Sequence, residues 1–224
     1  MLSSRITAVI LAAGKGTRLK SELPKVLHEI CGRPMLAYVL DACRQADVRR
    51  CVIVVGHRQD LVRAALADDA DAVWVTQEPQ QGTGHAVMVC REQIRNYEHV
   101  LVLCGDGPLI RGEVVREVIE RHVAEDAAAT LATAVLDDPS GYGRIVRDAG
   151  GRFRGIVEHA DATPEQRQIR EVNPSYYCFR VADLMPALGP APSQQQEGRV
   201  LHHRRARPVR GRGQESARDQ LGAP

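Results

Sequence analysis

Short apolar runs that alternate with amphipathic segments constrain the fold of this chain more than any other feature. Four runs are apolar almost without interruption, as expected for strands that are buried on both faces of a parallel sheet. They are RITAVILAA (5–13), RCVIVVG (50–56), DAVWVTQ (71–77) and HVLVLCGD (99–106). Segments with apolar residues three and four positions apart, which indicate helices, cover 34–46, 57–67, 85–95 and 112–125. Repeated strand and helix units predict an α/β fold with a doubly wound, mostly parallel sheet.

The pattern changes after about residue 127. Segments 127–139, 143–159 and 172–181 are rich in β-forming residues, and the second contains a Gly-Gly turn. They predict an antiparallel extension of the sheet. Ligands of open α/β sheets bind at the carboxyl ends of the strands, so the residues that follow the four apolar runs are the first candidates for a functional site.

Composition excludes several classes of partner. A length of 224 residues suits one domain with a buried core. The formal net charge of +2 is close to balance, and no apolar run approaches the roughly 18 residues of a membrane span. We therefore expect a cytoplasmic protein without a nucleic-acid or membrane partner. Six scattered cysteines without CxxC spacing indicate reduced core thiols instead of disulfides or a zinc site.

The loop after the first apolar run, LAAGKGTRLKSELPKVL (11–27), predicts a phosphate site. Gly-Lys-Gly directly after a buried strand lets backbone N–H groups approach phosphate oxygens. The spacings GxxxxGK[ST] and GxGxxG are both missing, which argues against a P-loop and a dinucleotide fingerprint. All lysines of the chain, Lys15, Lys20 and Lys25, lie in this stretch, and a compact ammonium suits a phosphate. A solvated basic turn is the alternative.

The motif LxxGxGTRxxxxxPK in this loop resembles that of the sugar-phosphate nucleotidylyltransferase family. Four further motifs follow in order: QEPQQGTGHAV (77–87), CGDGPLI (104–110), DDPSGYGRIVRD (137–148) and GIVEHADATPEQRQIREVN (155–173). Together they resemble the uridylyltransferase domains of bifunctional N-acetylglucosamine-1-phosphate uridylyltransferase/glucosamine-1-phosphate acetyltransferases. The resemblance implies a Rossmann-like nucleotidyltransferase fold, with a C-terminally incomplete nucleotidylyltransferase domain at 1–190.

The resemblance also implies a role for each matching residue. Arg18 and Lys25 would be catalytic, with Lys25 beside the reacting phosphate. Gln77 would recognise uracil by reading its imide edge with the paired donor and acceptor of the side-chain amide, although by itself it reads as a surface polar residue at a strand end. The other positions implied in binding nucleotide or substrate are Leu11, Ala12, Ala13, Gly14, Lys15, Gly16, Gly82, Thr83, Cys104, Gly105, Asp106, Gly143, Glu158 and Asn173. The last three match positions that bind the acceptor sugar.

Asp106 stands at the end of the fourth apolar run and would hold Mg²⁺. Mg²⁺ needs only one or two protein carboxylates, because water and substrate phosphate complete its octahedron. A cap for the following turn is the alternative role of this carboxylate.

The implied reaction joins UTP and N-acetylglucosamine 1-phosphate to give UDP-N-acetylglucosamine and pyrophosphate. The sugar phosphate is already an anionic nucleophile, so alignment and charge neutralisation suffice for catalysis. Two alternatives remain: a nucleotidylyltransferase for another sugar phosphate or nucleotide, and a nucleotide-sugar-binding remnant without turnover.

Three features depart from the family pattern. Directly before Gly105-Asp106, Cys104 stands where the family has an aromatic residue. Directly after it, Gly107 stands where the family has a small β-branched residue. Pro174-Ser175 replaces Thr-Gly after Asn173. The family's second metal ligand, an Asn, has no counterpart, and no hexapeptide repeats of an acetyltransferase half are present. We therefore expect an activity that these departures impair.

The segment from Gln194 onward contains seven Arg, no Lys and no aromatic residue. Where the resemblance implies Glu-Tyr-Tyr-Ile-Thr-Asp, residues 198–205 read GRVLHHRR. The permitted codons GGC CGA GTA CTA CAT CAC CGA C, read one base later, encode Ala-Glu-Tyr-Tyr-Ile-Thr-Asp. We predict that residues 191–224 are an Arg-rich, disordered tail translated after a frameshift near residues 188–194. A nucleic-acid-binding arm is the alternative.

Overall fold

The computed structural model describes residues 4–16 and 19–189 of the chain. Contacts divide them into two compact units. The first comprises the chain up to Leu131 and a returning segment that begins at Ser175, and the second comprises Ala132–Pro174. The tail predicted for 191–224 and the catalytic candidate Arg18 lie outside the described residues.

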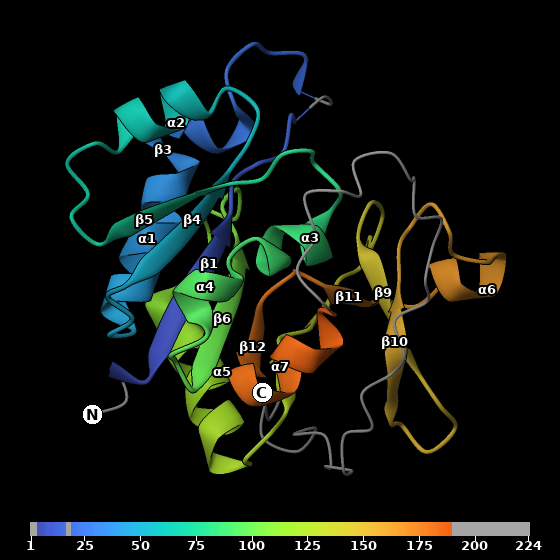
Figure 1. Ribbon diagram of the computed structural model, residues 1–224. Coiled ribbons are helices and arrows are strands. Elements are labelled where there is room, and N and C mark those ends of the chain that lie inside the picture. The colour runs from blue at the N-terminus through green and yellow to red at the C-terminus, as the bar shows by residue number, and fades with distance from the viewer. Residues whose placement is uncertain (1–3, 17–18, 190–224) are drawn as a thin grey trace. The chain divides into compact units, whose positions relative to one another are not determined.

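A six-stranded sheet forms the centre of the first unit, in the order β5-β4-β1-β6-β12-β7 (Figure 1). The strands are β1 (Ile6–Leu11), β4 (Cys51–Val55), β5 (Ala72–Thr76), β6 (His99–Cys104), β7 (Ala129–Leu131) and β12 (Tyr177–Arg180). Strands β1, β4, β5 and β6 are parallel, β12 pairs with β6 in antiparallel orientation, and β7 pairs with β12 in antiparallel orientation. The predicted α/β fold class is therefore confirmed, and of the three segments expected to extend the sheet, 127–139 and 172–181 supply β7 and β12.

Helices cover both faces of this sheet. Successive side chains of β1, β4 and β6 point to opposite faces, and nearly all of them are buried, so both faces must be covered. Val9, Val52 and Val102 face one way and pack with Ala86 and Ile94 on short helices. The helices of the first unit are α1 (Met35–Gln45), α2 (Gln59–Ala65), α3 (Thr83–Met88), α4 (Arg91–Ile94), α5 (Gly112–Ala124) and α7 (Val181–Ala187). The helix expected over 85–95 is thus divided into α3 and α4.

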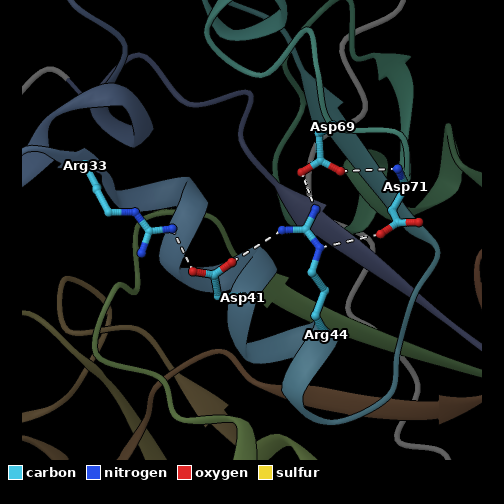
Figure 2. A network of polar contacts seen from close by, with 5 residues as sticks. All are labelled: Arg33, Asp41, Arg44, Asp69 and Asp71. Atoms are coloured by element: carbon cyan, nitrogen blue, oxygen red, sulfur yellow. Dashed lines mark hydrogen bonds and ion pairs between the residues drawn. The ribbon is translucent and has the colours of Figure 1, made fainter.

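An ion-pair network at the surface of the first unit anchors α1 (Figure 2). Asp41 accepts from Arg33 at 2.7 Å and from Arg44 at 3.3 Å. Arg44 also reaches Asp69 at 2.5 Å and Asp71 at 3.5 Å, in the segment between α2 and β5. These charges satisfy one another and include no predicted site residue, which makes Asp41 suitable for a control substitution.

The second unit contains a four-stranded sheet in the order β10-β9-β11-β8. Its elements are β8 (Ala134–Val135), β9 (Gly143–Arg147), β10 (Phe153–Val157), α6 (Pro164–Arg167) and β11 (Glu171–Asn173). The predicted Gly-Gly turn joins β9 to β10. This hairpin pairs with β11 in a sheet of its own and does not extend the central sheet as expected.

Candidate functional site

The loop after β1 has the backbone geometry of a close-approach loop. Ala12 continues the strand by donating its N–H to the Val54 carbonyl at 2.8 Å. Gly16 has a φ of +61°, and a Cβ at this position would lie 2.7 Å from Cβ of Lys25. A side chain at position 16 is thus excluded by both strain and space. Leu11, Ala13, Gly14 and Lys15 complete the described part of this loop, in which Lys15 is exposed.

Lys25 and Asp106 form an ion pair between Nζ and Oδ2, although 81 positions separate them in the chain. Lys25 opens the short 3-10 helix η3 (Lys25–Leu27), and Asp106 follows β6. Their side chains are 42% and 30% exposed, so both remain accessible to a ligand. The N–H of Gly105 donates to the Leu11 carbonyl at 2.9 Å, which ties the Asp106 turn to the end of β1.

Gln77 is placed at the end of β5 as expected, but its side chain is only 4% exposed. Its Nε2 donates to the Gly82 carbonyl at 2.9 Å and lies 3.1 Å from Nδ1 of His85. With the imidazole proton on Nε2, both amide hydrogens are engaged within the chain. Only the side-chain oxygen of Gln77 is then available to read a base, as an acceptor, which differs from the paired donor and acceptor expected from the sequence.

Gly82 precedes α3 with a φ of +89°, and Thr83 is the first residue of that helix. An added Cβ at Gly82 would meet nothing within 4 Å, so backbone conformation is what requires glycine there. The second predicted close-approach loop therefore has the geometry expected of it.

Gln80 is a structural member of the site that the sequence reasoning missed. Its Nε2 donates to the Ala13 carbonyl at 2.6 Å, so it links the 77–83 loop to the loop after β1. A Cβ on Gly56 would lie 2.6 Å from the same nitrogen, which shows how closely the amide packs on that glycine. Its position between Gln77 and Gly82 was the available signal.

The second unit brings together the three residues predicted for the acceptor sugar. Asn173 of β11 pairs with Gly143 of β9, and Glu158 directly follows β10. A Cβ on Gly143 would lie 3.3 Å from Oε1 of Glu158. Asn173 is 7% exposed. Gly143 thus lies next to both Asn173 and Glu158, although the three residues are far apart in sequence.

Cys104 lies before the Asp106 turn as a protonated thiol. Burial raises its pKa to about 11, with the Asp106 charge adding to the effect, while a hydrogen bond with Ser175 opposes it. The thiol is therefore a poor nucleophile at neutral pH, and its role here is to pack.

The predicted metal ligand Asp106 is 30% exposed, and its Oδ2 is paired with Nζ of Lys25. Within 4–16 and 19–189, no three His, Cys, Asp or Glu side chains gather into a metal-binding group. Mg²⁺ does not need such a group, because one carboxylate with water and substrate phosphate can complete its coordination. The accessible Asp106 carboxylate fits that requirement as a single protein ligand.

None of the helices in the described part of the chain could cross a bilayer.

Comparison with known proteins places this geometry in a family context. A model of the MobA-like NTP transferase domain matches residues 8–208. The chain is 50% identical over 183 residues to the Bifunctional protein GlmU of Heliobacterium modesticaldum, covering 81% of this chain and 40% of the relative. It is 48% identical over 181 residues to the protein of the same name from Desulfitobacterium hafniense, covering 81% and 39%. The chain thus spans about two fifths of these relatives.

Solved structures support the fold. UDP-glucose pyrophosphorylase complexed with UDP-glucose matches with a TM-score of 0.66 at 19% identity, covering 81% of this chain and 78% of the other. HddC from Yersinia pseudotuberculosis complexed with GMP-PN matches with a TM-score of 0.63 at 22% identity, covering 79% and 77%. At these identities the likeness concerns the fold alone.

Proposed function

The chain belongs to the family of MobA-like NTP transferase domains, and we propose that it transfers UMP from UTP to N-acetylglucosamine 1-phosphate in the cytoplasm. The products are UDP-N-acetylglucosamine and pyrophosphate. Relatives at 48–50% identity that bear the name Bifunctional protein GlmU support this assignment. The observation that carries it is the Lys25–Asp106 ion pair, in which a cation that would bind phosphate, at the start of η3, meets a carboxylate that would bind the metal, just after β6.

The triphosphate would bind along the loop after β1. Gly16 leaves the backbone accessible, while Lys15 and Lys25 supply positive charge, and Arg18 would add to it. Leu11, Ala12, Ala13 and Gly14 would contact the nucleoside through their backbone atoms.

The base would be read by the Gln77 side-chain oxygen and the backbone at Gly82-Thr83. With the His85 proton on Nε2, the Gln77 amide nitrogen is engaged by Gly82 and His85, and this side chain would act as an acceptor. Uracil presents an N3–H donor at its imide edge, whereas cytosine presents an acceptor at the same atom. This geometry favours UTP over CTP.

The sugar would be bound by the cluster in the second unit. Glu158 can accept hydrogen bonds from sugar hydroxyls, and the Asn173 amide can both donate to and accept from the acetamido group. Gly143 leaves space beside Glu158, where a side chain would crowd the carboxylate.

The chemistry requires no protein base. An oxygen of the sugar phosphate attacks the α-phosphorus of UTP, and the bond from that phosphorus to the pyrophosphate oxygen breaks. Lys25 would offset the charge on the phosphate that reacts, and Cys104 and Gly105 would hold Asp106 in place. Asp106 would hold Mg²⁺, which would supply positive charge to neutralise the reacting phosphates.

The test is pyrophosphate release by the full chain with UTP, N-acetylglucosamine 1-phosphate and Mg²⁺. We expect turnover that falls when CTP replaces UTP or glucose 1-phosphate replaces the acetamido sugar. Asp106→Asn should lower turnover by about 100-fold or more, because it removes the metal-binding charge while keeping the volume.

Asp41→Asn is the matched control, since it removes a carboxylate of the same unit from the surface network of Figure 2. It should leave turnover unchanged. Equal rates for UTP and CTP would refute the assigned base, and unchanged rates in Asp106→Asn would refute the assigned metal site. Nucleotide binding without pyrophosphate release would identify a binding remnant.

A further inference from the structure

Two positions that depart from the family pattern, Gly107 and the segment at Ser175, meet in the structure. A Cβ placed on Gly107 would lie 2.9 Å from the hydroxyl oxygen of Tyr176 and 3.6 Å from its Cε1. Real Cβ atoms essentially never approach another atom so closely, so a methyl group at position 107 would displace this terminal hydroxyl. The hydroxyl of Tyr176 therefore occupies the space that a side chain at position 107 would fill.

The backbone at Ser175 directs Tyr176 to this place. Ser175 has a φ of +65°, a left-handed conformation that is uncommon for a residue other than glycine. The chain then enters β12, where Tyr177 pairs with Val102 of β6 in antiparallel register. Tyr176 consequently stands beyond the last paired residues, beside the turn that follows β6.

The same turn is held from its other side by close packing around Gly105. A Cβ on Gly105 would lie 3.1 Å from the Leu11 carbonyl oxygen and 3.2 and 3.3 Å from Val26 and Leu36. Asp106 sits between these two glycines. Its backbone is thus confined by the core at Gly105 and by Tyr176 at Gly107.

We propose that Tyr176 is a positioning residue, whose hydroxyl packs against Gly107 and thereby fixes the orientation of the Asp106 carboxylate toward the metal. The inference rests on the proposed function only through the assignment of Asp106 as metal ligand. It predicts that positions 107 and 176 are coupled: each change alone loosens the turn, and the two changes together restore it.

The test is a double-mutant cycle with Gly107→Ala, Tyr176→Phe and the double variant. Alanine is compatible with the backbone at position 107, whose φ lies outside the left-handed region. Removing the hydroxyl leaves the next neighbours of the new methyl at 3.6 Å, an ordinary contact distance. Phenylalanine alone leaves a gap, alanine alone creates a clash, and the pair fits.

The readout is binding of Mn²⁺ in the presence of UTP, followed by electron paramagnetic resonance of free Mn²⁺. We expect each single variant to weaken Mn²⁺ binding by about fivefold or more, and the double variant to lie within about twofold of wild type. UTP binding without metal should stay unchanged in all four proteins. This measurement is the check on folding, because a general loss of structure would lower UTP binding. Gly155→Ala is the control, since its Cβ would meet nothing within 4 Å.

Three results would each overturn the inference. They are additive weakening of Mn²⁺ binding in the double variant, unchanged Mn²⁺ binding in the single variants, and no Mn²⁺ binding by wild type. Pyrophosphate release is measured separately on the same proteins. Coupled Mn²⁺ binding without pyrophosphate release would support the positioning role and refute the proposed function. Additive losses of Mn²⁺ affinity together with pyrophosphate release would refute the positioning role and support the proposed function.

Discussion

Protonation of His122 should make the first unit sensitive to acid. This residue of α5 is completely buried, with Nδ1 3.0 Å from the Thr130 hydroxyl and its ring edge-on to that of His99 at 5.0 Å. Burial lowers the pKa of His122 to about 4, and His99 and Arg180 add to the effect against an opposing contribution from Asp126. Burial also lowers the pKa of His99.

The direction of the effect follows from which state binds the proton first. An unfolded chain protonates histidine near pH 6.5, whereas folded His122 stays neutral until about pH 4. Its contribution to stability is therefore complete above pH 6.5 and is lost as the pH falls toward 4. A pKa difference of about 2.5 units, at about 1.36 kcal/mol per unit, amounts to about 3 kcal/mol. Typical domains unfold at a cost of about 5–15 kcal/mol, so the loss is large.

The perturbation is His122→Gln, which keeps a polar group within reach of Thr130 and removes the titration. Urea unfolding followed by fluorescence of Trp74, the only tryptophan, gives the free energy of unfolding at each pH. Between pH 6.5 and 4.5 the wild type should lose about 2–3 kcal/mol more than the variant does. His57→Gln, at a partly exposed histidine, is the control and should follow wild type. Parallel pH profiles for wild type and His122→Gln would refute the reasoning.

Three further pairs of substitutions test the nucleotide loops. Lys25→Arg should recover only part of the turnover lost in Lys25→Ala, because a planar guanidinium cannot replace a compact ammonium in this turn; full recovery would contradict that. Gly16→Ala should lower the melting temperature, since both the φ of +61° and the 2.7 Å approach to Lys25 oppose a methyl group, whereas Gly14→Ala, whose methyl meets no neighbour within 4 Å, should leave the melting temperature unchanged. Equal effects at the two glycines would be the contrary result. Gln80→Ala should raise the Kd for UTP about fivefold by releasing a loop carbonyl, a change absent from Gln81→Ala.

The sequence alone determined the elements of the first unit and the places of most candidate residues. Nearly continuous apolar runs identify β1, β4, β5 and β6, because strands buried on both faces can tolerate few polar side chains. Glycines that follow those runs indicate the close-approach loops, because only glycine adopts a positive φ at little cost. Both kinds of information lie within a few neighbouring residues.

Tertiary structure decided what depends on residues distant in the chain. The β9–β10 hairpin has the predicted turn, yet its sheet is chosen by pairing with β11, and no local pattern specifies that partner. The engagement of the Gln77 amide and the bond from Gln80 to the Ala13 carbonyl arise where two loops pack together. The approach of Tyr176 to Gly107 likewise requires β12 to return beside β6. Such contacts are fixed by packing and by the register of paired strands, which become defined only when the whole chain has folded.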